Sequence, residues 1–183
     1  MSVGEVTPPT VVLVGLMGTG KSTVARKLGE RLGRPVIDTD RAVEATEGRS
    51  VREIFASSGE DAFREMESRA LEVALDGGSA VVAAAGGIVL RRSNRELLVA
   101  ARRRGLAIVV WLRADTNSLV ARTSRGAHRP LLDGDPAGTL SRLADERGAL
   151  YAEVADAVVD TDDLDVDAVA DAVLGVLGGA DSP

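Results

Sequence analysis

The sequence predicts a single α/β domain, in which a parallel sheet of about five strands carries helices on both faces. Short apolar segments alternate with longer segments of helical periodicity from residue 10 to residue 178. The apolar segments are continuous runs, which is typical of strands that are covered on both faces. With 183 residues, no internal repeat and no interdomain linker, the chain fits one domain with a sizeable core.

The first half of the chain is expected to form strands at about 10–15, 35–38 and 80–85. Helices are expected at about 21–32, 39–46, 50–58 and 60–75, with glycines at or near their ends. Ser50-Val51-Arg52-Glu53 is a capping box that opens the third of these helices, and Gly59 breaks it. The fourth helix carries a predicted buried stripe of Phe63, Met66, Ala70, Val73 and Ala74.

The second half is expected to form strands at about 106–112 and 157–160. Its helices are expected at about 93–104, 116–122, 138–151 and 166–177. Ser93-Asn94-Arg95-Glu96 has the pattern of a second capping box, which predicts the start of the first of these helices. Residues 1–9 and 179–183 are expected to be flexible tails.

Composition excludes several classes of protein. The chain has no Cys and a single His, which excludes disulfides, thiolate metal sites and multi-histidine metal sites. Its net charge of −6 and its 2% aromatic content do not fit a nucleic-acid-binding surface. It shows no signal-peptide pattern and no apolar run near the ~20 residues of a membrane helix. We therefore expect a cytoplasmic monomer that binds neither nucleic acid nor membrane.

The segment Gly15-Leu16-Met17-Gly18-Thr19-Gly20-Lys21-Ser22 has the spacing G-x-x-x-x-G-K-[ST] between a predicted strand and a predicted helix. Glycines let backbone N–H groups turn inward around a polyphosphate, at the positive end of the helix dipole. Lys21 can reach the β- and γ-phosphates and Ser22 can ligate Mg²⁺. A plain glycine turn is the alternative, but the strand and helix around it favour phosphate binding.

Ligands of parallel sheets bind beyond the carboxyl ends of the strands, so functional residues are expected there. Asp38 and Asp40 follow the second strand at positions i and i+2, which would point both to one side of a strand. One carboxylate can serve Mg²⁺ while the other faces a hydroxyl group that is to be phosphorylated. The alternative is that one of them caps the next helix.

Two further segments lie at predicted strand ends. Gly86-Gly87 would let the backbone approach a ligand closely, unless it is an ordinary turn. Residues 123–136 are polar and turn-rich and would form a mobile lid in a phosphate-transfer enzyme, with Arg129 or Arg122 neutralising charge, unless they are a plain surface loop. Arg64 and Glu67 are one helical turn apart and could be a simple surface ion pair.

Taken in order, these motifs resemble the shikimate kinase family over about residues 10–178. The resemblance rests on Gly15–Thr23, Asp38-Thr39-Asp40, Ile54-Phe55, Gly59-Glu60, Phe63-Arg64, Glu67, Gly86-Gly87, Arg129-Pro130-Leu131-Leu132 and Arg147-Gly148-Ala149-Leu150-Tyr151. It implies a P-loop kinase domain with a lid at about 123–136, which uses ATP and Mg²⁺ to phosphorylate the 3-hydroxyl of shikimate in aromatic amino-acid biosynthesis. The chain departs from the family pattern at Ala83, at Ala85 and in the segment Asp160–Asp163.

The resemblance also implies roles for individual residues. It implies catalytic roles for Lys21, Asp40 and Arg129, and a metal-binding role for Ser22 and Asp38. It implies nucleotide binding by Gly15, Gly18, Thr19, Gly20, Lys21, Ser22, Thr23, Arg122 and Arg129. It implies substrate binding by Asp40, Arg64, Gly86, Gly87 and Arg147, in a pocket shaped by Phe55, Phe63 and Glu67.

Three other functions are compatible with parts of this pattern. A related kinase acting on gluconate or a shikimate-like cyclitol acid is the alternative, although Arg64 with Arg147 favours a carboxylate substrate. A guanine-nucleotide switch would need an Asn-Lys-x-Asp element, and neither Lys21 nor Lys27, the only lysines, follows an Asn. An inactive nucleotide-binding relative is disfavoured by the joint presence of Lys21, Asp40 and Arg129.

Overall fold

Five parallel strands form the centre of the protein, in the order β2-β3-β1-β4-β5. This computed structural model describes residues 7–124, 132 and 134–180. The strands are β1 (Thr10–Val14), β2 (Val36–Asp38), β3 (Val81–Ala83), β4 (Ala107–Arg113) and β5 (Ala157–Asp160). The helices are α1 (Lys21–Leu32), α2 (Thr39–Glu47), α3 (Val51–Asp76), α4 (Arg92–Arg103), α5 (Thr116–Thr123), α6 (Pro136–Val154) and α7 (Val166–Ala180). The predicted α/β fold with a five-stranded parallel sheet is confirmed.

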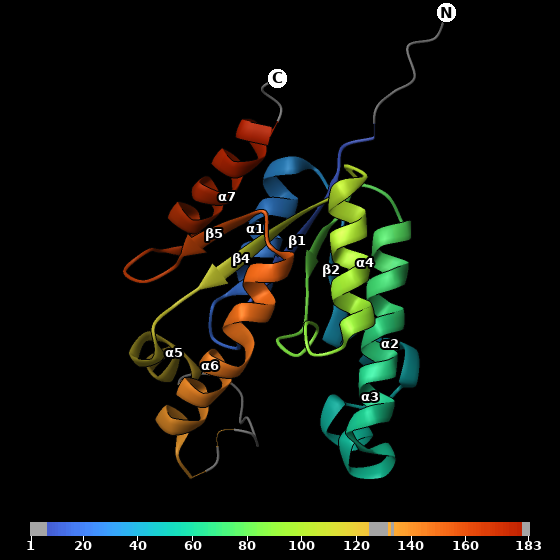
Figure 1. Ribbon diagram of the computed structural model, residues 1–183, viewed down its shortest axis with the longest axis vertical. Coiled ribbons are helices and arrows are strands. Elements are labelled where there is room, and N and C mark those ends of the chain that lie inside the picture. Colours follow the sequence, from blue (N-terminus) through green and yellow to red (C-terminus); the bar gives the residue numbers. More distant parts are fainter. Residues whose placement is uncertain (1–6, 125–131, 133, 181–183) are drawn as a thin grey trace, which may run out of the picture.

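Helices cover both faces of the sheet because its central strands are apolar on both sides. Val11 and Leu13 of β1 pack in a cluster with α1 and α7. Val12 and Val14 pack in a second cluster with the end of α3, α4 and α6. All five residues of β1 are buried, as expected of a central parallel strand. Figure 1 shows α1 and α7 on one side of the sheet, with α4 and α6 on the other.

A third, smaller core joins α2 to the first part of α3, away from the sheet. It contains Val43, Ile54 and Phe63. The capping box at Ser50 and Glu53 is confirmed, and Gly59 interrupts α3 with φ 81° and ψ 173°. In Figure 1 this pair of helices lies beyond one end of the sheet, opposite α5 and the start of α6.

The buried stripe of α3 differs from the prediction. Val73 is 72% exposed, whereas Leu71 is fully buried. The stripe runs through Phe63, Glu67, Leu71 and Ala74, with Met66 and Ala70 at its edge. Hydrophobicity alone gave the wrong stripe because a carboxylate, Glu67, occupies one of the buried positions.

The capping box predicted at Ser93–Glu96 is wrong, because α4 already begins at Arg92. Asn94 is buried, and its side-chain amide donates a hydrogen bond to the carbonyl of Ile88 at 2.9 Å. Asn94 is therefore a residue of the helix itself, and its side chain connects α4 to the preceding turn. The start of α6 also differs: Asp135 caps this helix by accepting from the amide of Gly138 at 2.9 Å, so the helix begins at Pro136.

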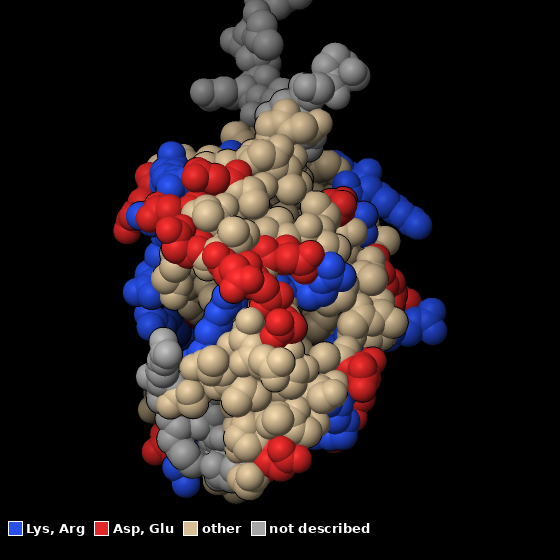
Figure 2. All heavy atoms as spheres, turned by 90° about the vertical axis from the view of Figure 1, so that its left-hand side faces the viewer, with Lys and Arg blue, Asp and Glu red and all other residues tan. Residues whose placement is uncertain are grey.

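The surface carries charges of both signs. On the face that includes α7, β5 and α5, acidic side chains form the most prominent charged group (Figure 2). Lys27 and Arg31 of α1 form ion pairs with Asp167 and Asp171 of α7 at the surface. Among the described residues, no helix is both long enough and apolar enough to cross a membrane.

Candidate active site

The segment between β1 and α1 forms the predicted glycine-rich loop. Gly15, Gly18 and Gly20 have φ values of 143°, 87° and 89°, which favour glycine. A side chain at Gly15 would also collide with the backbone of β4 at Leu112. The ammonium group of Lys21 donates to the carbonyls of Gly15 and Leu16, both at 2.9 Å, so it lies across the loop.

The two threonines of this loop lie in different environments. Thr19 is buried and its hydroxyl donates to the carbonyl of Leu16 at 2.8 Å, which braces the loop. Thr23 is exposed in the first turn of α1. Gly20 caps α1 with no side chain, so the first amides of the helix face no capping group from that residue. Such an arrangement is suited to binding phosphate.

Ser22 and Asp38 are brought together from α1 and the end of β2. The hydroxyl of Ser22 donates to Asp38 Oδ2 at 2.6 Å. Asp38 Oδ1 also accepts from the amide of Arg41 at 3.3 Å, so this residue caps α2 as well. Asp40 lies in the first turn of α2, so the prediction that both carboxylates share one side of a strand is wrong. They nevertheless lie within electrostatic reach of each other.

The Ser22–Asp38 pair fits a Mg²⁺ ion that is bound mainly by phosphates. It offers one hydroxyl and one carboxylate, both hard oxygen ligands, at the surface beside the glycine-rich loop. Within the described part of the chain there is no group of three or more acidic, His or Cys side chains placed to hold a metal. Mg²⁺ at nucleotide sites is commonly held by one or two protein ligands together with phosphate oxygens and water.

Asp40 has the electrostatic properties of a base that works near neutral pH. Burial first, and then the neighbouring charge of Asp38, raise the pKa of its carboxyl group to about 6. Lys21 and Arg64 act in the opposite direction. The carboxyl group is therefore mostly ionised at pH 7 and holds a proton more readily than a solvated aspartate, as a general base requires.

Arg64 is held between two glutamates of α3. It forms an ion pair with Glu67 at 2.6 Å and another with Glu60 at 3.0 Å. Glu67 is only 1% exposed, so the alternative of a simple surface ion pair does not hold. Burial raises the pKa of Glu67 to about 7, although the charge of Arg64 lowers it. The guanidinium group of Arg64 lies against Gly87, where it fills the space that a side chain would need.

Gly86 lies between the Arg64–Gly87 contact and the glycine-rich loop. A Cβ atom at Gly86 would lie 3.4 Å from the carbonyl oxygen of Gly15 and 3.8 Å from Arg147 Nη1. The carbonyl of Gly86 accepts hydrogen bonds from Arg147 at 3.1 Å and from the hydroxyl of Tyr151 at 2.5 Å. Arg147 Nε and Glu67 Oε1 are buried and have no hydrogen-bond partner within the described chain. These two atoms are candidates to bind polar groups of a substrate.

The loop, the acidic residues and the two arginines lie close together, in an arrangement that is chemically suited to a phosphate donor beside an anionic acceptor. A model of the shikimate kinase family matches residues 17–177 of this chain. The chain belongs to the shikimate kinase family. Relatives named shikimate kinase from Symbiobacterium thermophilum and Rhodopseudomonas palustris are 48% and 42% identical to it. Their alignments cover 83% and 91% of this chain, and 86% and 80% of the relatives.

The solved structures agree with this assignment. A shikimate kinase from Acinetobacter baumannii in complex with shikimate superposes on this kinase with a TM-score of 0.89 at 34% identity. The match covers 97% of both chains. The predicted resemblance is thereby confirmed, and the alternative of a gluconate or cyclitol-acid kinase is not favoured.

Ala85, where this kinase departs from the family pattern, causes no backbone strain. Among the residues that the structure describes, Asp163 is the only non-glycine residue with positive φ, so Ala85 has an ordinary backbone conformation. Its methyl group is accommodated in a buried position. Its amide donates to the hydroxyl of Thr39 at 2.9 Å. Thr39 was not identified from the sequence as a support for this turn, although it stands between the two aspartates.

Arg122 lies at the end of α5, beside the segment that follows β5. Its guanidinium group donates to the Thr161 side chain at 2.8 Å and to the Thr161 carbonyl. Arg129 and most of the predicted lid, residues 125–131 and 133, lie outside the described residues. Of the predicted lid bounds, Thr123 belongs to α5 and residue 136 opens α6.

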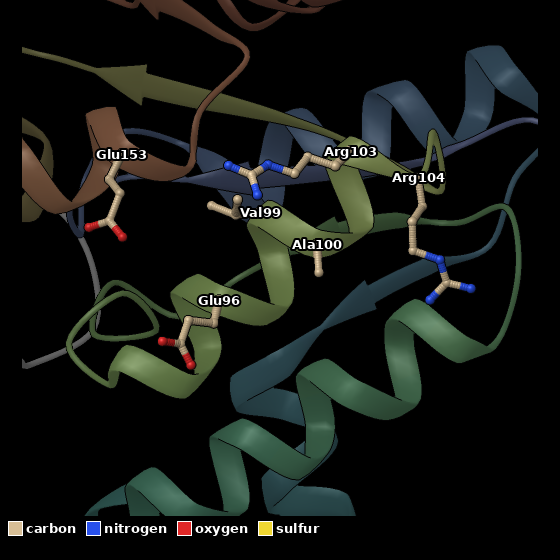
Figure 3. Close-up of a pocket in the computed structure, with 6 residues that line it drawn as sticks. All are labelled: Glu96, Val99, Ala100, Arg103, Arg104 and Glu153. Carbon is tan, nitrogen blue, oxygen red and sulfur yellow. The ribbon is translucent and has the colours of Figure 1, made fainter.

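A cavity elsewhere on the kinase contributes no residue to this site. It has a volume of about 450 Å³ and is lined by Glu96, Val99, Ala100 and Arg103 of α4, by Arg104 directly after this helix, and by Glu153 of α6. Figure 3 shows five of these side chains spread along α4 and its C-terminal end, with Glu153 on the neighbouring helix α6 and with acidic and basic groups apart from one another. The cavity does not bring its polar groups together toward one point, as a binding site for a small ligand would.

Proposed function

We propose that this protein transfers the γ-phosphoryl group of ATP to the 3-hydroxyl of shikimate, in aromatic amino-acid biosynthesis. The observation that carries the proposal is the placement of Arg64 and Arg147 around the Gly86–Gly87 turn, next to the phosphate-binding loop. Two guanidinium groups are suited to a carboxylate, because their planar donors match its two oxygens. The family's named members support shikimate as the carboxylate-bearing acceptor.

In this mechanism the residues act mainly by placement and by charge. Arg64 and Arg147 bind the acceptor carboxylate, which directs its hydroxyl group toward Asp40. Asp40 accepts the proton of that hydroxyl as the oxygen attacks the γ-phosphorus, while the bond from this phosphorus to the bridging oxygen breaks and ADP leaves. Lys21, which already lies across the loop, interacts with the phosphoryl group as negative charge spreads over its oxygens.

Ser22 and Asp38 would hold Mg²⁺. When bound, the ion supplies neutralisation of the charge on the phosphate chain. The roles of Arg129 as the lid arginine and of Thr19, Thr23 and Arg122 at the nucleotide are further parts of this proposal. The monomeric state and the cytoplasmic location expected from composition remain predictions as well, and light scattering of the purified protein would test the first.

A coupled assay that follows ADP release tests the proposal. Purified protein would be given Mg-ATP with shikimate, quinate, gluconate or a nucleoside monophosphate. We expect turnover with shikimate and at least a hundredfold lower kcat/KM with the other acceptors. Turnover of gluconate with none of shikimate would replace the proposal by its alternative.

A further inference from the structure

Tyr151 is among the most completely buried side chains of the described residues, with 1% exposure. It lies on α6 one helical turn after Arg147, so both side chains project from the same face of the helix. Its ring packs against Trp111, with the ring centroids 5.6 Å apart. The packing needs only the ring, yet the buried hydroxyl donates to the carbonyl of Gly86 at 2.5 Å. Burial raises the pKa of Tyr151 to about 12, so the hydroxyl keeps its proton.

The hydrogen bond from Tyr151 to the carbonyl of Gly86 also restrains the amide N–H of Gly87, which belongs to the same peptide group. The described chain has no cis peptide bond, so the carbonyl of Gly86 and the amide N–H of Gly87 point in opposite directions in one plane. Fixing the carbonyl toward Tyr151 and Arg147 therefore fixes the direction of the Gly87 amide. That amide belongs to the residue against which Arg64 packs.

A turn of two adjacent glycines needs such a restraint, because glycine has the widest choice of backbone conformations. Thr39 holds the preceding amide, at Ala85, while Tyr151 and Arg147 hold the carbonyl of Gly86. We propose that Tyr151 is a positioning residue, whose hydroxyl orients the Gly86–Gly87 peptide and the guanidinium of Arg147 for acceptor binding. This inference rests on the proposed function, because it assigns Tyr151 to the shikimate side of the site.

Tyr151 also affects Arg147, because both side chains donate to the carbonyl oxygen of Gly86. Arg147 Nη1 and the Tyr151 hydroxyl donate to the same oxygen, while Arg147 Nε has no hydrogen-bond partner within the described chain. Without the hydroxyl, the carbonyl of Gly86 would depend on Arg147 alone or turn away from it. Either change alters the direction of the remaining guanidinium donors, which in the proposed function bind the carboxylate.

The test compares Tyr151→Phe with Trp111→Phe. The first removes only the hydroxyl, and the second disturbs the packing of the same ring but keeps the hydroxyl. We expect Tyr151→Phe to raise the KM for shikimate about tenfold, with an unchanged KM for ATP and a kcat within about threefold of wild type. We expect Trp111→Phe to lower the melting temperature without changing the KM for shikimate. Both substrates are measured in the same coupled assay.

Several outcomes would overturn the inference. One is a folded Tyr151→Phe variant with a wild-type KM for shikimate. Another is a Tyr151→Phe variant in which the KM for ATP rises as much as the KM for shikimate. A third is an equal rise of the KM for shikimate in Tyr151→Phe and in Trp111→Phe. Wild-type protein without shikimate turnover would instead refute the proposed function, so the two failures are distinguishable.

A second measurement covers the case in which Tyr151→Phe does not fold. Tyr151 is the single tyrosine of the chain, so biosynthetic 3-fluorotyrosine labels this site alone. We expect the ¹⁹F resonance of the labelled wild-type protein to shift when shikimate is added without nucleotide. A resonance that does not move at saturating shikimate would show that the hydroxyl does not report on the acceptor site, and would overturn the inference.

Discussion

The guanidinium group of Arg64 fills the space into which any side chain at Gly87 would project. The two residues come from α3 and from the turn after β3, so this contact joins the helix pair α2–α3 to the sheet. Gly87 is therefore required by a close approach of a side chain, and not by a positive φ angle. The same contact fixes where Arg64 can present its donors.

Gly87→Ala should displace Arg64 and raise the KM for shikimate at least tenfold, because the added methyl group collides with the guanidinium. The KM for ATP should change little. Gly148→Ala is a matched control: Gly148 is next to Arg147 on α6, and a Cβ there meets no atom within 4 Å. This control should leave both KM values unchanged and raise stability by up to about 1 kcal/mol. Wild-type shikimate kinetics in Gly87→Ala would contradict the role of this contact.

Glu60 and Glu67 share Arg64 as a partner but differ in burial, with 61% and 1% of their side chains exposed. Glu60→Ala should change stability by less than about 1 kcal/mol, as is usual for an exposed ion pair. Glu67→Ala should cost about 2 kcal/mol or more, because Arg64 would lose its buried partner. It should also raise the KM for shikimate. Urea denaturation and steady-state kinetics on both variants measure the difference, and equal effects would show that burial does not matter here.

Ala85→Gly should restore the glycine that is usual in the family without changing the acceptor. Ala85 has no positive φ, and its hydrogen bond to Thr39 uses the backbone amide, which glycine retains. We expect an unchanged preference among shikimate, quinate and gluconate. Stability should fall by roughly 0.5–1 kcal/mol, because glycine loses more conformational entropy on folding. A changed acceptor preference would mean that the methyl group itself selects the substrate.

Much of the fold could be predicted because its signals are local. The apolar runs, the glycines after helices and the capping box at Ser50 each specify a short element, and the G-x-x-x-x-G-K-[ST] spacing specifies a loop. The errors arose where tertiary contacts decide. Asn94 looks like part of a cap but bonds to Ile88 in the interior, and Val73 fits a helical stripe but is exposed.

The same distinction holds for the candidate site. Lys21, Ser22 and Asp38 lie in recognisable motifs, so their proximity could be anticipated. The burial of Glu67 could not, since a carboxylate in a helix is ordinarily solvated and only the fold places it beneath Arg64. The hydroxyl of Tyr151 was also missed as a functional group, because its partner is a backbone carbonyl 65 residues away in the chain.

Asp40 gives a prediction about pH. If Asp40 must be ionised to accept the proton, kcat/KM for shikimate should fall about tenfold per pH unit below about 6, the pKa to which burial raises this carboxyl group. Asp40→Asn should lose nearly all activity at every pH and should show no such titration. A wild-type profile that stays flat between pH 5 and pH 7 would exclude Asp40 as the base.

The same pKa predicts that ionisation of Asp40, which activity requires, lowers the stability of the folded protein. Because the folded-state pKa of Asp40 lies above its ordinary value of 3.8, ionising this group costs folding free energy. The cost is absent below about pH 4, grows as the pH rises to about 6, and is constant above that. Asp40→Asn removes it, so the inactive variant should be more stable than wild type at pH 7, by up to about 3 kcal/mol, and not at pH 4. Thermal denaturation at the two pH values measures this difference, and an Asn variant that is less stable at pH 7 would show that the ionised carboxylate is favourably bound in the folded protein.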